Sequence, residues 1–381
     1  MNASDQLRPP NCEIYELMGG RLQHPSPLVQ TVLIFNIVIN CLSCPFTALL
    51  NALVMIAVKV KSRLRARKSN ILIALLASTD FAVGIIIQPA FTALVMVILL
   101  DETTNGACAL QFVTRSAMSC LVDVSLIHLV LISGERYLAM KHTFAHITFL
   151  TVNRLLFASA LAWLLNVILH IPLVTDKTQY LHIDSAIIAL SIVFIVFCHV
   201  TVYRVIRQHQ QKIATQQVSE EAREQIQSDK KAFKLTSTIV VVLLLCYSPI
   251  FAFRVILLRY RSEVSLETVY IVYFLAMSMM SLNSLLNPII YSVSMRQFRV
   301  AFIELMCRTV NFSEAEEIEM RVFGEQNAVV RLEERQESGE LDVQQANVNR
   351  NDNHENIVLP QQNENEEGQL QHSCERRHYS T

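Results

Sequence analysis

The fold of this chain is decided by residues 110–141, which read LQFVTRSAMSCLVDVSLIHLVLISGERYLAMK. At about 1.5 Å per residue, a helix over this stretch exceeds the roughly 30 Å of a bilayer's hydrocarbon, so it must tilt or project beyond the membrane. The stretch nevertheless contains ionisable groups, namely Arg115, Asp123, His128, Glu135 and Arg136. Because a charge at membrane depth costs at least about 2.5–3.5 kcal/mol, we expect these side chains to face protein or water inside a bundle of further helices.

Composition agrees with an all-α membrane protein. Apolar residues make up 52% of the 381-residue chain, and a water-soluble protein of this size would show shorter apolar runs. The net charge of −1 is a balance between basic short loops and an acidic C-terminal region, and we expect no nucleic-acid partner. No nucleophile–base set and no metal-ligand cluster lies near a loop, so we expect no enzyme.

Seven apolar runs predict seven transmembrane helices, at about 29–58, 69–100, 110–141, 155–174, 182–206, 232–258 and 268–293. We expect a very short outer loop at about 175–181 and a polar helical extension of the fifth run over 207–231. Six cations within ten residues follow the first run and place that loop in the cytoplasm: Lys59, Lys61, Arg63, Arg65, Arg67 and Lys68. The predicted protein is therefore a multi-pass protein of the plasma membrane, with its N-terminus outside and its C-terminus inside.

Four segments follow from this topology. Residues 1–28 form the extracellular N-terminus, and residues 29–293 form the seven-transmembrane domain. Residues 294–307 alternate apolar and charged side chains and predict a short amphipathic helix on the inner leaflet. Residues 308–381 are rich in Gln, Asn and Glu, so we expect a disordered acidic cytoplasmic tail.

One motif falls in each span but the fifth, in chain order: Asn51, Leu76-Ala77-x-x-Asp80, Glu135-Arg136-Tyr137, Trp163, Pro249 and Asn287-Pro288-x-x-Tyr291. Phe298 stands seven residues after Tyr291. Between about residues 36 and 307 the chain thus resembles a rhodopsin-like (class A) G protein-coupled receptor. The resemblance implies a receptor that binds an extracellular ligand in the helix bundle, activates a heterotrimeric G protein by outward movement of the sixth helix, and binds arrestin.

The resemblance also implies a pocket for an allosteric sodium ion in the inner half of the bundle. Its residues would be Asn51, Asp80, Ser125, Asn283, Ser284 and Asn287. An oxygen-rich set of this kind suits a hard cation. The alternative is a structural hydrogen-bond network between helices, and we expect no other cofactor.

The residues that the resemblance assigns to G protein coupling and switching are Glu135, Arg136, Tyr137, Asp229, Tyr247, Pro249, Asn287, Pro288 and Tyr291. Asp229 stands where similar receptors clamp the arginine to the sixth helix, although a solvated charge at a helix end explains it equally well. Three positions depart from the family pattern: Tyr247 replaces the usual Trp, Leu243 the usual Phe, and Ile195 a frequent Pro. These departures put the switch beneath the ligand in doubt.

The predicted ligand pocket contains Arg115, Met118, Ser119, Val122, Ile250, Phe251, Arg254, Met277 and Ser281. Met118 replaces the carboxylate of amine receptors, and Ser281 replaces the lysine of opsins. Two arginines beside an apolar cavity suit an amphipathic anion such as a lipid with an acidic head. Alternatively, both arginines reach the outer surface and pair with Asp101, Glu102 or Glu263. The ligand could belong to any of three classes: a small molecule, a lipid or a peptide.

Three further sites concern covalent chemistry. Asn2 begins a glycosylation sequon, and Cys307 follows the amphipathic helix as a candidate for palmitoylation. Residues 175–185 contain no cysteine for the bridge usual in the family, so Cys108 either pairs with Cys12 or both are free thiols. The short second outer loop without cysteine resembles that of receptors in the melanocortin, lysophospholipid, cannabinoid and adenosine branch.

Two other classes stay open. A transporter or channel is disfavoured because seven spans do not divide into two repeats and no internal repeat is visible. A receptor-like protein that binds ligand without G protein signalling has the same sequence features. A second-messenger assay in transfected cells would separate the signalling receptor from the non-signalling one.

Overall fold

The computed structural model describes residues 22, 24–100, 105–170, 177–215, 220–259, 263–307 and 310–323. Some side chains inside these helices, including those of Asp229 and Arg254, lie outside the description. The chain falls into two units, Met1–Glu319 and Met320–Thr381, and the membrane-spanning helices all belong to the first. The described residues contain no strand.

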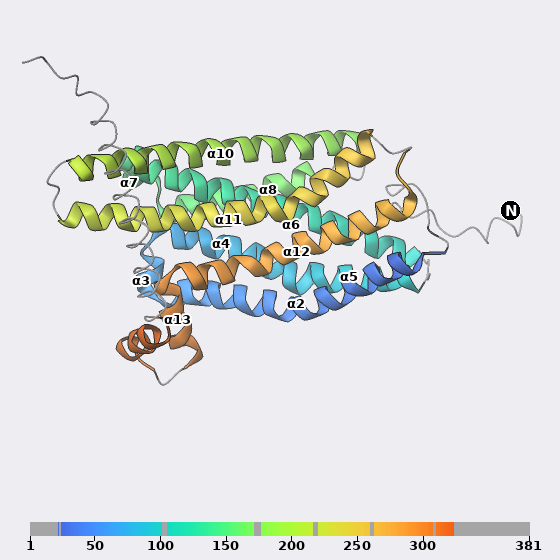
Figure 1. The fold of residues 1–381 in the computed structure, drawn as a ribbon, viewed down its shortest axis with the longest axis horizontal. Helices are drawn as coiled ribbons and strands as arrows, with labels where there is room; N and C mark the ends of the chain where they lie inside the picture. Colours follow the sequence, from blue (N-terminus) through green and yellow to red (C-terminus); the bar gives the residue numbers. More distant parts are fainter. Residues whose placement is uncertain are drawn as a thin grey trace, which may run out of the picture. The chain divides into compact units, whose positions relative to one another are not determined.

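Seven helical runs among the described residues are long and apolar enough to cross a membrane. They extend side by side (Figure 1) and are α2 (Pro27–Val60), the continuous run of α4 (Lys68–Ala82), η1 (Val83–Ile87) and α5 (Gln88–Leu99), α6 (Asn105–Lys141), α8 (Val152–Leu169), α10 (Lys177–Thr215), α11 (Glu220–Arg259) and α12 (Leu266–Ser294). Short helices α3 (Ser62–Arg65), α7 (Thr143–Phe149) and α13 (Arg296–Met306) lie between or after them. The predicted all-α, seven-span architecture is confirmed.

Side-chain caps set where several helices begin. The hydroxyl of Ser26 accepts a hydrogen bond from the amide of Val29, and Pro27 opens α2 at a position where its missing N–H costs nothing. The hydroxyl of Ser265 likewise accepts from the amide of Thr268 at the start of α12. The amide of Ser26 donates to a carboxylate oxygen of Glu267, 3.2 Å away, so the outer ends of α2 and α12 are tied together.

The second span contains one turn of π-helix, η1, immediately before Pro89. Proline lacks the amide hydrogen that an α-helix needs, and a widened turn is one way in which a helix accommodates it. Gly84 lies in this turn, and a Cβ added to it would be 2.8 Å from the backbone nitrogen of Ala48. The first two spans therefore approach as closely as they do because residue 84 has no side chain.

The bundle has an apolar exterior and a polar interior at several levels. Large hydrophobic side chains such as Leu49, Phe157 and Leu190 are exposed, as expected where lipid would surround the helices. In contrast, Asp123, His128 and Glu135 are almost fully buried. The expectation that the ionisable groups of the third span avoid lipid is confirmed for these three residues.

The described structure corrects the predicted boundaries of the fourth and fifth spans. The fourth span was expected to reach residue 174, but α8 ends at Leu169 and residues 171–176 lie outside the described residues. The expected outer loop at 175–181 is wrong in part, because α10 begins at Lys177. The polar extension of the fifth span is helical to Thr215, and a separate helix, α11, begins at Glu220.

The expected disorder from residue 308 onward is wrong for residues 312–323, which are helical. The helix has a capping box at its start: the side-chain oxygen of Asn311 accepts from the amide of Glu314, and a Glu314 carboxylate oxygen accepts from the amide of Asn311. Glu319, only 2% exposed, pairs with Arg296 at 2.8 Å and Arg299 at 2.7 Å. Composition suggested disorder, but these ion pairs hold residues 312–319 against α13. Residues 324–381 lie outside the described residues.

Candidate functional site

The arginine of the Glu-Arg-Tyr motif is held at the inner end of α6 by its own neighbour. Nε of Arg136 donates to Oε2 of Glu135 at 2.6 Å, and its Nη2 donates to Oε1 at 3.2 Å. The Glu135 side chain is 2% exposed and that of Arg136 is 17% exposed. A two-pronged, charge-assisted contact of this kind fixes the guanidinium more firmly than a single bond would.

Sequence reasoning missed a second partner of Glu135. Nε2 of His146, on α7, lies 3.0 Å from Oε1 of Glu135. The ammonium of Lys68, at the start of α4, donates to the backbone carbonyl of the same histidine at 3.1 Å. The second inner loop therefore folds back as a helix onto the inner ends of the second and third spans. A histidine eleven residues after Glu135 was the only available signal.

Tyr137, the third residue of the motif, faces a different environment. Its ring lies against the ring of Phe197 on α10, with 5.8 Å between centroids. Its hydroxyl is 3.5 Å from Nε2 of His142. This residue therefore contacts the fifth span and the second inner loop rather than the arginine.

Asp80 is linked directly to the seventh span, a contact that fits the sodium pocket and the structural network alike. Its Oδ2 accepts a 2.8 Å hydrogen bond from the side-chain Nδ2 of Asn287, and both residues are about 1% exposed. Nδ2 of Asn51 donates to the backbone carbonyl of Ser284 at 2.9 Å. The first, second and seventh spans are thus joined by buried polar contacts at one level.

Several buried oxygens in the predicted sodium pocket have no hydrogen-bond partner among the described residues. They are Oδ1 of Asp80, Oγ of Ser125 and the Oδ1 atoms of Asn51, Asn283 and Asn287. Buried oxygens are normally satisfied, so a set of this size needs water or a cation to complete it. The donor atoms are all oxygens, which is the chemistry that a hard cation prefers.

A polar stripe on the first span was not predicted beyond Asn51. Asn36, Asn40, Ser43 and Thr47 are all buried at spacings of three or four residues, which places them on one face of α2. Nδ2 of Asn40 donates to the hydroxyl of Ser278 on α12, and that hydroxyl donates to Oδ1 of Asn36. The regular spacing of amides in an apolar run was a readable signal for an interhelical seam.

The three positions that depart from the family pattern pack in one core. Ile195 and Leu243 are each 2% exposed and belong to the same apolar cluster at the inner side of the bundle, with Tyr247 against it. Tyr291 lies in that cluster and contacts the ring of Phe298 on α13, with 6.1 Å between centroids. Pro249 lies two residues after Tyr247 on α11.

Most described members of the predicted ligand pocket do face the bundle. Met118 and Val122 are buried in a second apolar cluster, against which Ile250, Met277, Tyr247 and Trp163 pack. Ser281 is 1% exposed, and its hydroxyl donates to the carbonyl of Met277 in its own helix. Arg115 and Ser119 are partly buried.

Phe251 is a wrong prediction, because its side chain is 65% exposed. Successive residues of a helix point about 100° apart, and the buried face of α11 is the one that carries Leu243, Cys246 and Phe253. Phe253 takes the inward place and contacts the ring of Tyr273 at 5.4 Å between centroids. The side chains of Arg254 and Asp229 lie outside the described residues, so their proposed roles stay predictions.

The covalent predictions fall largely outside the described residues. Asn2 and Cys12 are not among them. Cys108 is disulfide-bonded, and its partner lies outside the description. Cys307 is exposed and carries a free thiol directly after α13, where palmitoylation stays a prediction.

Comparison with known proteins gives two findings. A family model described as "7 transmembrane receptor (rhodopsin family)" matches residues 50–291. A cannabinoid receptor 1 of Taricha granulosa is 25% identical over 293 residues, which are 68% of this chain. The match covers 60% of the length of that relative.

Proposed function

Because the chain belongs to the rhodopsin family of seven-transmembrane receptors, we propose that it binds an extracellular ligand in the helix bundle and activates a heterotrimeric G protein. As a member of that family it is a multi-pass protein of the plasma membrane and a receptor rather than an enzyme. The observation that carries the proposal is the Glu135–Arg136 ion pair at the inner end of the third span.

The mechanism uses the proline of the sixth helix and this ion pair. Pro249 interrupts the backbone hydrogen bonds of α11, which gives the inner half of that helix a place to swing outward. When it does, Arg136 exchanges Glu135 for backbone carbonyls and the C-terminal helix of the G protein. The ligand favours this state by binding it more tightly than the state with the ion pair closed.

The test compares two substitutions at matched surface expression. Arg136→Ala should silence second-messenger output but keep ligand binding, since the residue lies far along α6 from the ligand pocket. Asp229→Ala should raise basal output, because a clamp worth about 1–2 kcal/mol holds a two-state equilibrium about five- to thirtyfold towards the inactive side. Full output from Arg136→Ala would refute the mechanism.

A second candidate function is supported by the departures at Tyr247, Leu243 and Ile195. All three pack in one core, where other members of the family carry the residues of the switch. The second candidate is therefore a receptor-like protein that binds ligand without G protein signalling. The same assay separates the two, because a non-signalling protein gives no output in the parent chain, and arrestin recruitment then becomes the next readout.

A sodium ion in the inactive receptor is part of the proposal. Asp80 would supply the negative charge, and Ser125, Asn283 and Asn287 would supply further oxygens, several of which lack other described partners. A bound ion would stabilise the inactive arrangement of the second and seventh spans. The alternative, a structural network, is already half formed by the Asp80–Asn287 bond.

We propose an amphipathic lipid with an acidic head as the ligand class. The support is the apolar cluster around Met118, Val122 and Met277, with the cationic Arg115 three residues before Met118 on α6. A relative named for cannabinoids also points to lipid-like ligands. A screen of anionic lipids against the parent chain and Arg115→Gln would test this, because only a ligand with a charged head should lose affinity in the variant.

The orientation is likewise proposed. Six cations between residues 59 and 68 support a cytoplasmic first loop, an extracellular N-terminus with Asn2 and a cytoplasmic tail after Cys307. A C-terminal tag that is labelled on intact, unpermeabilised cells would overturn this topology.

A further inference from the structure

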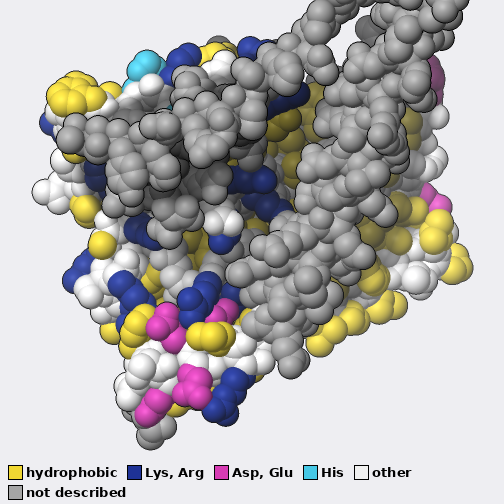
Figure 2. Space-filling model, turned by 60° about the vertical axis from the view of Figure 1, so that its left-hand side comes forward, with side chains coloured by type: hydrophobic (Ala, Val, Ile, Leu, Met, Phe, Trp, Pro, Cys, Tyr) yellow, Lys and Arg dark blue, Asp and Glu magenta, His cyan; other side chains and the backbone are white. Residues whose placement is uncertain are grey.

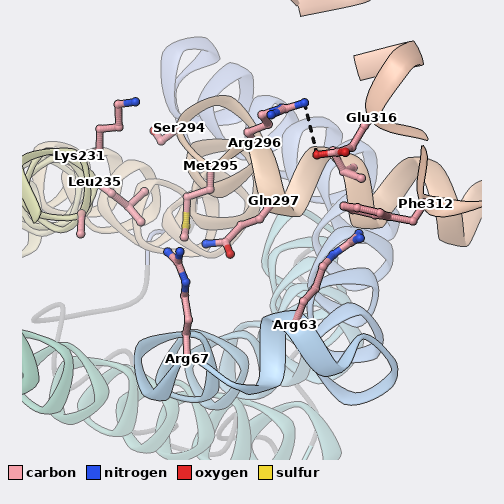
Figure 3. Close-up of a pocket in the computed structure, with 12 residues that line it drawn as sticks. Arg63, Arg67, Lys231, Leu235, Ser294, Met295, Arg296, Gln297, Phe312 and Glu316 are labelled. Atoms are coloured by element: carbon pink, nitrogen blue, oxygen red, sulfur yellow. Dashed lines mark ion pairs between the residues drawn. The ribbon is translucent and has the colours of Figure 1, made fainter. Parts of the chain in front are cut away.

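A cavity of about 320 Å³ lies at the inner end of the bundle, among elements distant in sequence. The first inner loop supplies Arg63 and Arg67, the start of the sixth span supplies Lys231, and Arg296 and Gln297 come from α13. Figure 3 shows Arg63 and Arg67 rising from one side towards Gln297 and Phe312 on the other. Figure 2 turns this end of the molecule towards the reader and shows Lys and Arg side chains gathered over it.

The described lining of this cavity carries four cations and one carboxylate, Glu316. Arg63 already pairs with Glu304 at 2.6 Å, and Arg296 with Glu319 at 2.8 Å. Arg67 and Lys231 have no acidic partner within the described part of the chain. The buried Nε of Arg63 also has no hydrogen-bond partner there. The lining therefore carries uncompensated positive charge at Arg67 and Lys231.

The size of the cavity limits the class of anion. An α-helix with side chains is about 10–12 Å across, so a helical segment of a partner does not fit inside 320 Å³. The volume lies at the lower end of the range typical of small-molecule pockets. A compact anion with several charges is of the size that this volume admits.

The donor types favour phosphate over carboxylate. Arginine binds phosphate through two parallel N–H bonds, and lysine binds it as a point charge. Arg67 comes from the first inner loop and Lys231 from the start of the sixth span, so the cations reach the cavity from two elements. Two or more phosphates on one small ring would supply an anionic group for each element.

We propose that this cavity binds a polyphosphorylated inositol, either free in the cytosol or as the headgroup of an inner-leaflet phosphoinositide. Arg67 and Lys231 make the charge-assisted contacts, and Leu235 and Met295 supply apolar lining for the ring. Because Lys231 belongs to α11, the bound anion links the first inner loop to the helix that moves in the proposed activation. The site itself is independent of that proposal.

The experiment uses the full chain purified into lipid nanodiscs and needs no signalling readout. In one arm, fluorescent inositol trisphosphate is titrated onto receptor in neutral lipid. In the other, native mass spectrometry counts phosphatidylinositol bisphosphate bound in nanodiscs, against phosphatidylserine at equal total charge. If free inositol trisphosphate binds in the first arm, the phosphorylated ring alone is sufficient for recognition. If only phosphatidylinositol bisphosphate binds, in the second arm, the ligand is the membrane lipid.

The variants test which cations matter. Arg67→Gln with Lys231→Gln should weaken binding by at least about tenfold, because two charge-assisted contacts are lost. The matched control removes two exposed cations outside the cavity, Arg65→Gln with Lys234→Gln, and should change affinity by less than about twofold. Arg67→Lys with Lys231→Arg keeps both charges and should retain binding, which excludes misfolding as the cause.

Three results would overturn the proposal. Phosphatidylserine that binds as well as the bisphosphate at equal charge would show only surface attraction. A control variant that loses as much affinity as the cavity variant would show the same. A phosphorylated acidic peptide that needs Arg67 and Lys231 where inositol phosphates do not bind would assign the cavity to a phosphoprotein.

Discussion

Nε2 of His146 lies 3.0 Å from Oε1 of Glu135, the residue that holds Arg136. The contact joins α7, in the second inner loop, to the arginine that the proposed mechanism releases. Glu135 is 3% exposed, so water replaces a lost partner poorly at this position. The second inner loop is therefore part of the restraint on Arg136, and its helix must yield when the arginine changes partners.

His146→Ala should raise basal signalling. One hydrogen bond to a charged group contributes about 1.5–3 kcal/mol, so its loss should shift the two-state equilibrium roughly ten- to a hundredfold. Glu135→Ala removes both contacts and should raise it further. Second-messenger output without ligand, at equal surface expression, measures the difference.

Thr148→Ala is the matched control for this prediction. Its hydroxyl donates to the carbonyl of Phe144 within α7, and the described residues show no hydrogen bond between Thr148 and α6. Basal output should therefore equal that of the parent chain. If Glu135→Ala raises output and His146→Ala does not, the histidine only anchors the loop.

Asp80→Asn should abolish a sodium effect on stability. A cation bound in the inactive receptor raises the free energy of unfolding by about 1.4 kcal/mol when its concentration is ten times its dissociation constant. The neutral amide cannot balance the ion's charge. Thermal unfolding of purified receptor in sodium chloride, against N-methylglucamine chloride at equal ionic strength, measures this.

Ser78→Ala serves as the comparison for Asp80. Its hydroxyl donates to the carbonyl of Leu75 in its own helix, so the sodium effect should persist. A sodium response that survives in Asp80→Asn would leave only the structural network of Asp80 and Asn287.

Gly84→Ala should destabilise the receptor, and Gly134→Ala should not. The new Cβ at residue 84 would be 2.8 Å from a backbone atom of Ala48, which cannot rotate away, and overpacking of this kind costs about 1–3 kcal/mol. At residue 134 the nearest atom is the ring of Phe194 at 3.7 Å, an ordinary contact. Thermal unfolding and surface expression of the two variants should separate them, and equal losses would contradict the steric account.

The spans could be predicted because a bilayer leaves so few alternatives. Every backbone polar group must be satisfied inside the membrane, so long apolar runs become helices, and buried charges such as Asp123 must turn inward. The Asp80–Asn287 link followed from motif positions rather than from any local pattern. Phe251 failed because the sixth span is apolar on several faces, and its sequence alone does not say which face packs.

The missed contacts all depend on how separate segments approach one another. His146 reaches Glu135 only because α7 folds back beneath the bundle, and nothing in its own sequence indicates that direction. Composition likewise predicted disorder after residue 308, but composition weighs each residue without its partner. Glu319 meets Arg296 and Arg299 from twenty or more residues away.

Glu319→Ala should release the helix that begins at residue 312, and Glu316→Ala should do so much less. Glu319 is nearly fully buried and pairs with Arg299, whose side chain is 11% exposed, and breaking a buried pair costs about 3–5 kcal/mol. Arg296 is 51% exposed, so its pair with Glu319 contributes little. Glu316 pairs with Arg296 at 3.4 Å with its side chain 37% exposed, and such surface pairs contribute about 0–1 kcal/mol. Amide hydrogen exchange over residues 312–319 measures the opening, and it should accelerate strongly only in Glu319→Ala. Slow exchange in both variants would mean that the capping box at Asn311, rather than the buried ion pairs, holds this helix in place.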